Sequence, residues 1–163
     1  MSFESQRTGD FEDIVVKYSD MVYKIAYAKV GNRSDADDIF QNVFLKYLNN
    51  KKPFINEEHR KAWLIKVTVN CSKSLFSSAW FKRTVPLTNE EPVYIEPESL
   101  ELHNVVMKLP SKYRVVIHLF YYEDMSIKQI SETLKIKPST VRAQLTRARN
   151  LLKDKLKGAN NFV

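Results

Sequence analysis

The clearest candidates for chemistry are polar and charged side chains on one face of a helix near the C-terminus. From Pro138 onward, apolar residues recur at three- and four-residue steps, which marks the buried side of an amphipathic helix. Arginine can bind the acceptor edge of guanine or a phosphate, and hydroxyl groups bind phosphate. The pattern favours contact with duplex nucleic acid, the alternative being a solvated basic face. The outward side carries Ser139, Thr140, Arg142, Ala143, Thr146, Arg147 and Arg149.

The elements before this helix would position it for that contact. Ser126 and Gln129 have the spacing of a capping box that opens a shorter helix. A tight segment, 135–137, separates the two helices, and Pro138 suits the first position of the second because its missing N–H costs nothing there. A short helix, a tight turn and a longer basic helix predict a helix-turn-helix, whose second helix enters the major groove.

A second candidate stripe combines aromatic rings with cations. On a helix predicted over 57–82, one face carries Trp63, Lys66, Asn70 and Lys73, and the loop before it places Phe54 among lysines with no evident core to enter. Rings stack on unpaired bases and ammonium groups bind phosphates, so this composition is typical of single-stranded nucleic-acid binding. A solvated basic face with Trp63 in the core explains the stripe equally well.

Residues for covalent chemistry do not form a pattern. The chain has one cysteine, Cys71, and three scattered histidines, which excludes an internal disulfide and gives no metal-ligand spacing. We find no nucleophile–base pair, phosphate-binding loop or carboxylate dyad. We therefore expect no enzyme activity, no catalytic residue, no cofactor and no metal.

Composition and charge predict an all-α protein with two small helical domains. The 163 residues are 44% hydrophobic and include only 3 glycines, too few for a fold built on tight turns. Residues 103–163 carry 12 basic and 4 acidic side chains, a net charge of +8, whereas 84–102 carry five acidic and no basic ones. Three prolines interrupt that acidic stretch. We expect domains at 1–83 and 99–163, joined by a flexible acidic linker at 84–98.

The first domain contains a helix with both acidic and apolar residues. After a helix that ends at Gly31 and Asn32, Ser34 and Asp37 predict a cap, and the next helix carries an apolar stripe from Ala36 to Leu48. A wide core stripe with a solvated acidic face is one interpretation. An exposed surface that docks a large partner is the other.

Targeting signals are not evident in the sequence. The first ten residues are polar, without the apolar stretch of a signal peptide, and no run of about 18 apolar residues occurs. We expect a protein that is neither exported nor membrane-spanning, which fits the cytoplasm.

Together these segments resemble the sigma-70 family of RNA polymerase sigma factors, in its two-domain, extracytoplasmic-function (ECF) group. The likeness covers about 11–157. Residues 35–44 (DADDIFQNVF) resemble the family's core-binding helix, 62–70 its promoter-melting helix, 109–114 the entry to the second domain, and 130–149 its helix-turn-helix. The family usually has glycine where Lys135 stands, which costs roughly 1 kcal/mol if that residue is left-handed.

The resemblance implies a region-2-like bundle and a region-4-like helix-turn-helix that bind bacterial core RNA polymerase and promoter DNA. The second domain would read the minus-thirty-five element through the outward face of its last helix. The resemblance also implies a clamp coiled coil of the largest polymerase subunit as the docking partner, and an anti-sigma factor that could hold the chain near the membrane. The implied minus-ten residues are Phe54, Trp63, Lys66, Asn70 and Lys73, and the implied docking residues are Asp38, Gln41, Asn42, Val43 and Phe44.

Two other functions stay open from the sequence. A helix-turn-helix regulator that acts as a dimer without polymerase would bind specific duplex DNA alone. An adaptor with an incidental basic helix would show no promoter-selective binding even with polymerase present.

Overall fold

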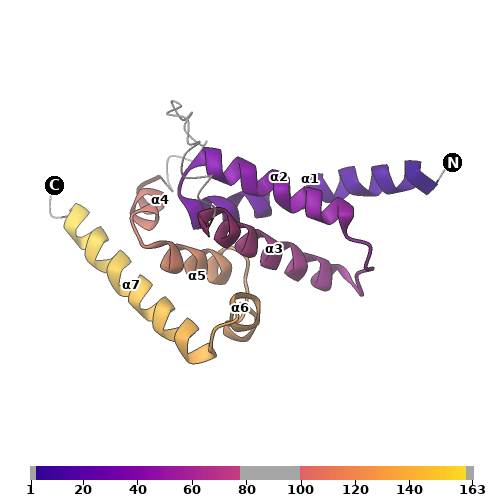
Figure 1. The fold of residues 1–163 in the computed structure, drawn as a ribbon. Helices are drawn as coiled ribbons and strands as arrows, with labels where there is room; N and C mark the ends of the chain where they lie inside the picture. Colours follow the sequence, from indigo (N-terminus) through magenta and orange to yellow (C-terminus); the bar gives the residue numbers. More distant parts are fainter. Residues whose placement is uncertain (1–2, 78–99, 161–163) are drawn as a thin grey trace. The chain divides into compact units, whose positions relative to one another are not determined.

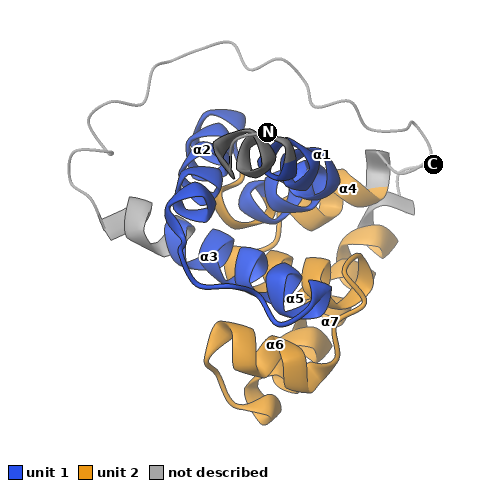
Figure 2. Ribbon diagram, turned by 90° about the vertical axis from the view of Figure 1, so that its right-hand side faces the viewer, with its two compact units in different colours: residues 1–27, 32–87 blue, residues 28–31, 88–163 orange. Residues whose placement is uncertain are grey.

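The structure is a computed structural model that describes residues 3–77 and 100–160, with side chains described over 10–71 and 102–157 (Figure 1). All regular structure in these ranges is helical. The expected linker, 84–98, lies outside the described residues, as does the side chain of Lys73. The chain divides into two compact units, residues 1–27 with 32–87, and residues 28–31 with 88–163 (Figure 2).

The first unit is built from three helices, α1 (Phe3–Val30), α2 (Arg33–Asn49) and α3 (Glu57–Ser77). α2 and α3 lie side by side (Figure 1). Each helix buries most of the described part of its apolar stripe, because removing apolar surface from water is the main favourable term in packing. The core includes Val22 and Ile25 from α1, Ile39 from α2, and Leu64 and Val69 from α3.

The turn between α1 and α2 differs in one detail from the sequence prediction. Gly31 ends α1 with a φ of +77°, a left-handed conformation that glycine adopts without strain. The cap of α2 is Asn32 rather than Ser34: its Oδ1 accepts from the Asp35 backbone N–H at 2.9 Å, and its Nδ2 donates to the Asp35 carboxylate at 2.9 Å. Asparagine caps as well as serine does, and this reciprocal pair satisfies the helix start two residues earlier.

The second unit contains α4 (Leu100–Met107), α5 (Ser111–Tyr121), α6 (Ile127–Leu134) and α7 (Pro138–Asn160). α7 packs against α4, α5 and α6. The fully buried side chains at their contacts include Leu109, Val116, Ile130, Val141 and Leu145. The expected short helix, tight turn and long helix are confirmed as α6, 135–137 and α7.

Candidate nucleic-acid and partner-binding surfaces

The turn between α6 and α7 fixes how α7 is presented. The predicted capping box is formed: Ser126 Oγ accepts from the Gln129 N–H at 3.1 Å, and the Ser126 N–H donates to Gln129 Oε1 at 2.9 Å. Lys135 ends α6 in the left-handed region at φ 56°, ψ 46°. The Ser131 hydroxyl donates to the Ile136 carbonyl at 2.5 Å, which ties the turn back to α6. The conformation of the turn is therefore fixed by hydrogen bonds to residues of α6 itself.

The outward face of α7 is free of the core. Val141, Leu145 and Ala148 are buried and hold the helix against its neighbours. The opposite face therefore offers hydroxyl groups and guanidinium groups together from one straight helix. The hydroxyls of Ser139 and Thr140 lie at the N-terminal end of the helix, where the helix dipole favours an anion. All seven predicted residues are exposed: Ser139, Thr140, Arg142, Ala143, Thr146, Arg147 and Arg149.

Arg149 stands seven residues after Arg142 on the same helical face, and its guanidinium is held against α5. Its Nε donates to the Tyr121 hydroxyl at 2.6 Å, and its guanidinium lies 5.5 Å from the Phe120 ring centroid and 5.6 Å from that of Tyr121. These contacts fasten α7 to α5. The Arg149 side chain is nevertheless exposed, and its assignment to the reading face stays a prediction.

The stripe on α3 combines an anchored ring with free polar groups. Lys66 and Asn70 are exposed, and Trp63 is half-buried. Positions 63, 66 and 70 share one helical face, along which 63 and 70 are separated by about 10 Å at 1.5 Å per residue. Neither of the two interpretations of Trp63 holds alone, since its ring is partly in the core and partly accessible.

Phe54 enters a cluster of rings that the sequence did not reveal. Its ring stacks on Tyr47 at a centroid distance of 5.9 Å with an interplanar angle of 7°, and meets Trp63 edge-on at 5.6 Å and His59 at 5.4 Å. The Arg60 guanidinium lies 5.3 Å from the Phe54 centroid. Phe54 is thus packed at the start of α3, whereas Asn70 lies two turns beyond Trp63. The two do not share one pocket.

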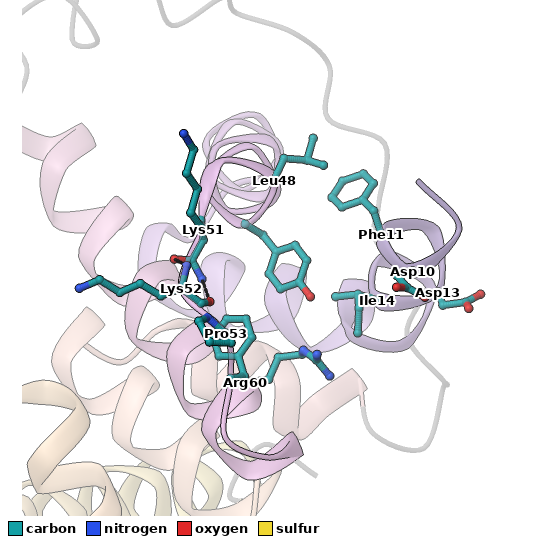
Figure 3. A pocket seen from close by; sticks show the side chains of 12 residues that line it. Asp10, Phe11, Asp13, Ile14, Leu48, Lys51, Lys52, Pro53 and Arg60 are labelled. Atoms are coloured by element: carbon teal, nitrogen blue, oxygen red, sulfur yellow. Dashed lines mark hydrogen bonds between the residues drawn. The ribbon is translucent and has the colours of Figure 1, made fainter. Parts of the chain in front are cut away.

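A cleft of about 1130 Å³ lies between the N-terminal part of α1 and the loop that follows α2, and the rings of Tyr47 and Phe54 form part of its wall. Figure 3 shows Asp10 and Asp13 on α1 across the cleft from Lys51 and Lys52 of the loop. Phe11 stacks on Tyr47 at 6.2 Å and continues the column of rings into α1. The cleft combines apolar walls with charges of both signs and holds no arrangement for acid–base or nucleophilic chemistry.

A hydrogen-bonded pair ties α1 to the start of α3. The Tyr18 hydroxyl donates to the Glu57 carboxylate at 2.6 Å, while Lys17 and Arg60 form ion pairs with the same carboxylate. Burial and this hydrogen bond raise the pKa of Tyr18 to about 12. The same bond lowers the pKa of Glu57. Both shifts favour a protonated hydroxyl facing an ionised carboxylate.

The outer face of α2 differs from the docking set expected from the sequence. Asp38, Gln41 and Asn42 are exposed, but Val43 is 0% and Phe44 4% exposed. The Phe44 ring packs on Phe40 at 4.9 Å and on Phe11 at 6.4 Å. Val43 and Phe44 belong to the core, so they were wrongly included as surface residues.

Sequence reasoning missed the apolar members of this outer face. Leu45 is 55% and Leu48 is 48% exposed. Leu45 stands four residues after Gln41 and seven after Asp38, a helical spacing that could have identified it. Partial burial and the neighbouring carboxylates of α2 raise the pKa of Asp38. The α2 outer face, defined as Asp38, Gln41, Asn42, Leu45 and Leu48, is a mixed acidic and apolar surface.

Membrane and metal sites were also sought among the described residues. No helix in those ranges is both long and apolar enough to cross a membrane. Within the same ranges, no group of three or more histidine, cysteine, aspartate or glutamate side chains could hold a metal ion.

Two family models match the chain, one in each unit. "Sigma-70 region 2" matches residues 14–82 and "Sigma-70, region 4" matches residues 99–152. The chain is 31% identical to the ECF RNA polymerase sigma factor SigW of Bacillus subtilis, covering 90% of this chain and 89% of that protein. It is 28% identical to the ECF RNA polymerase sigma factor SigE of Mycolicibacterium smegmatis, covering 90% of this chain and 61% of the relative.

Solved structures share the fold. The sigma factor RpoE of Bartonella quintana, solved with the anti-sigma factor NepR, has a TM-score of 0.65 at 19% identity, with 91% of this chain and 97% of that chain covered. CnrH, solved with the cytosolic domain of CnrY, has a TM-score of 0.60 at 21% identity, with 91% and 88% covered.

Proposed function

The chain belongs to the ECF group of the sigma-70 family of RNA polymerase sigma factors, and we propose that its two units divide promoter recognition between them. It binds core RNA polymerase and directs initiation at specific promoters. Residues 1–83 dock on the polymerase and open the minus-ten element, residues 99–163 read the minus-thirty-five element, and residues 84–98 connect them. The observation that carries this division is the exposed polar face of α7 on a complete helix-turn-helix.

The second unit reads duplex DNA through α7. Arg142 and Arg147 are long enough to reach guanine acceptors in the major groove, where each bidentate contact discriminates by about 1–3 kcal/mol. Ala143 and Thr146 lie between them and contact base edges or the thymine methyl group. Ser139 and Thr140 bind phosphate through their hydroxyl groups at the start of the helix. Arg149 contributes by holding α7 on α5 rather than by reading a base.

The first unit binds the melted minus-ten strand along α3. Lys66 and the neighbouring Lys73 neutralise phosphates, the accessible part of Trp63 stacks on a base, and Asn70 donates to or accepts from a base edge. Phe54 helps to position the Trp63 ring, because the two rings are packed edge-on against each other. Stacking and hydrogen bonds to extruded bases offset an unstacking cost of a few kcal/mol.

The α2 outer face docks on the polymerase. Exposed leucines flanked by carboxylate and amide groups form the kind of mixed surface that a partner covers, with an apolar centre and a polar rim. The partner is the clamp coiled coil of the largest subunit. Basic residues on that coiled coil would form ion pairs with Asp38. Val43 and Phe44 support this surface from within the core.

Both units are needed for selective binding. A single helix-turn-helix reads few base pairs, and a handful of phosphate contacts gives an affinity that falls steeply with salt. Mounting both units on one enzyme makes the second contact intramolecular, so the spacing of the two elements becomes part of the specificity. This explains why selection of a promoter depends on core polymerase.

The remaining assignments follow from the family. We assign no catalytic step, cofactor or metal to the chain, and its place is the bacterial cytoplasm, where polymerase and promoter DNA are. An anti-sigma factor is expected as a further partner, since the related fold of RpoE was solved with one. Such an inhibitor, if membrane-anchored, would hold the chain near the membrane. The matches give no support to a dimeric regulator that ignores polymerase.

Replacing Leu45 by aspartate tests the docking surface. We expect Leu45→Asp to fold normally and to lose assembly with core polymerase, measured by size-exclusion chromatography and by transcription from a promoter with both elements. Val16→Asp is the matched control, because Val16 is a similarly exposed apolar residue, 80% exposed, on α1 rather than on α2. Normal assembly of Leu45→Asp, or equal losses in the two variants, would contradict the assignment.

A further inference from the structure

A groove of about 590 Å³ lies within the second unit, between α7 and the helices α4 and α5. Most of its lining is apolar: Ile117 is 4% exposed, and Leu152 and Leu156 are half-buried. Its edge leaves two rings in water, since Tyr121 is 51% and Tyr122 is 60% exposed. Pockets that bury a small ligand have volumes of about 300–1,000 Å³, so this groove can take a few side chains.

One side of this groove is basic. Arg149, Lys153 and Lys157 follow one another at four-residue steps on α7, so they form a row along the helix beside Leu152 and Leu156. Lys153 and Lys157 are exposed, and no acidic residue is among the described residues that line the groove. An apolar surface beside a row of cations favours an occupant that is both apolar and acidic.

The connecting segment 84–98 has this composition. It carries four glutamates, at 90, 91, 96 and 98, and no basic residue. Its longest apolar run is 93–95, with the sequence Val-Tyr-Ile, and glutamates stand on both sides of that run. Prolines at 92 and 97 fix their own φ and favour extended backbone in the residue before each. Ordering this run therefore costs less entropy than ordering an unrestricted one.

The run is also tethered close to the groove. α4 begins at Leu100, and Leu102 and Val106 of this helix line the groove. Residue 95 precedes Leu100 by five positions, and five extended residues span up to about 17 Å. A short tether gives an effective concentration of the order of mM, which exceeds that of separate chains in dilute solution. The tether therefore favours this run over an acidic surface of a second copy.

We propose that residues 93–95 dock in the groove between α4, α5 and α7 while the chain is free, with the neighbouring glutamates paired with Lys153 and Lys157. Docking removes the leucine side chains and the Tyr121 and Tyr122 rings from water, which is the favourable term. A partner that binds this groove must displace the run, which lowers the apparent affinity of that partner. The inference goes beyond the proposed function and does not depend on it.

Disulfide trapping in the full-length chain tests the docking. Val93→Cys, which keeps its position apolar, is combined with Lys153→Cys in the groove or, as the matched control, with Lys155→Cys. Both lysines are exposed on α7, but Lys155 does not line the groove, and the two closed loops differ by only two residues. In a glutathione buffer we expect the intramolecular disulfide to form about tenfold faster with Lys153→Cys than with Lys155→Cys. The native Cys71 is buried and is kept.

Two further changes to the trapping pair separate docking from chance proximity. Ile95→Asp places a charge in the apolar run and is expected to slow trapping at 153 to the control rate, whereas Thr88→Asp adds the same charge outside the run and leaves the rate unchanged. Equal rates at 153 and 155, or a rate that Ile95→Asp does not alter, would overturn the proposal. Disulfides formed only between chains would also overturn it, because they would identify a second copy as the occupant. The assay contains neither polymerase nor DNA, so its outcome is independent of the proposed function.

Discussion

Replacing Lys135 by glycine should stabilise the second unit. Lys135 holds φ 56° and ψ 46° at the end of α6, a conformation that costs a residue with a Cβ about 1–2 kcal/mol. Glycine removes that cost, but its greater conformational freedom in the unfolded chain opposes folding by about 0.4–1 kcal/mol. The backbone bonds of the turn, from Lys135 and Ile136 to the Ser131 carbonyl, need no side chain and remain. The net gain is about 0.5–1 kcal/mol.

Thermal unfolding followed by circular dichroism measures this gain. For a unit of this size, about 1 kcal/mol raises the midpoint of its transition by about 4–8 °C, so Lys135→Gly should raise it by several degrees. Lys155→Gly is the matched control, because the same change in the interior of α7 lowers stability by about 1 kcal/mol. An unchanged or lowered midpoint for Lys135→Gly would refute the argument that backbone conformation, and not the lysine side chain, determines stability at this turn.

Helical periodicity predicted the elements of the fold because it depends only on neighbouring residues. The α6 capping box, the turn at 135–137 and the start of α7 at Pro138 all follow from local spacing. The same reasoning predicted which side of α7 is exposed, and all seven residues that it named there are exposed. Periodicity and capping are sufficient to predict exposure where the exposed side depends on the sequence of one helix alone.

Contacts between distant segments account for the differences. Periodicity locates the apolar stripe of α2 but not its width, which is set by the Phe11 ring of α1 covering Phe44. The Arg149 guanidinium is held against α5 because a hydroxyl 28 residues earlier accepts its N–H. Phe54 found ring partners on both α2 and α3. None of these partners can be inferred from the spacing of the residues they meet.

Three further predictions concern individual side chains. Phe44→Ala should lower the free energy of unfolding by about 3–5 kcal/mol, whereas Leu45→Ala should change it by less than about 0.5 kcal/mol, both measured by urea denaturation. Arg147→Ala should relax minus-thirty-five selectivity by about 1–3 kcal/mol in competition transcription assays, while Arg149→Ala should lower stability and leave base preference unchanged. The pKa of Tyr18 is raised from 10.0 in the unfolded chain to about 12 in the folded protein, so its protonated hydroxyl stabilises the first unit below pH 10, and this contribution disappears as the pH rises through about 12. Tyr18→Phe should remove that part of the alkaline pH dependence of the free energy of unfolding. Identical pH profiles for the variant and the wild type would exclude the assigned hydrogen bond.

Mapping transcript start sites with core polymerase, with and without the chain, tests the central claim most directly. Two helical units that recognise DNA only when both are carried by polymerase should create a defined set of new start sites. Each should be preceded by two sequence elements at a constant spacing, and inserting half a helical turn between those elements should abolish initiation. Start sites that are the same with and without the chain would contradict the account.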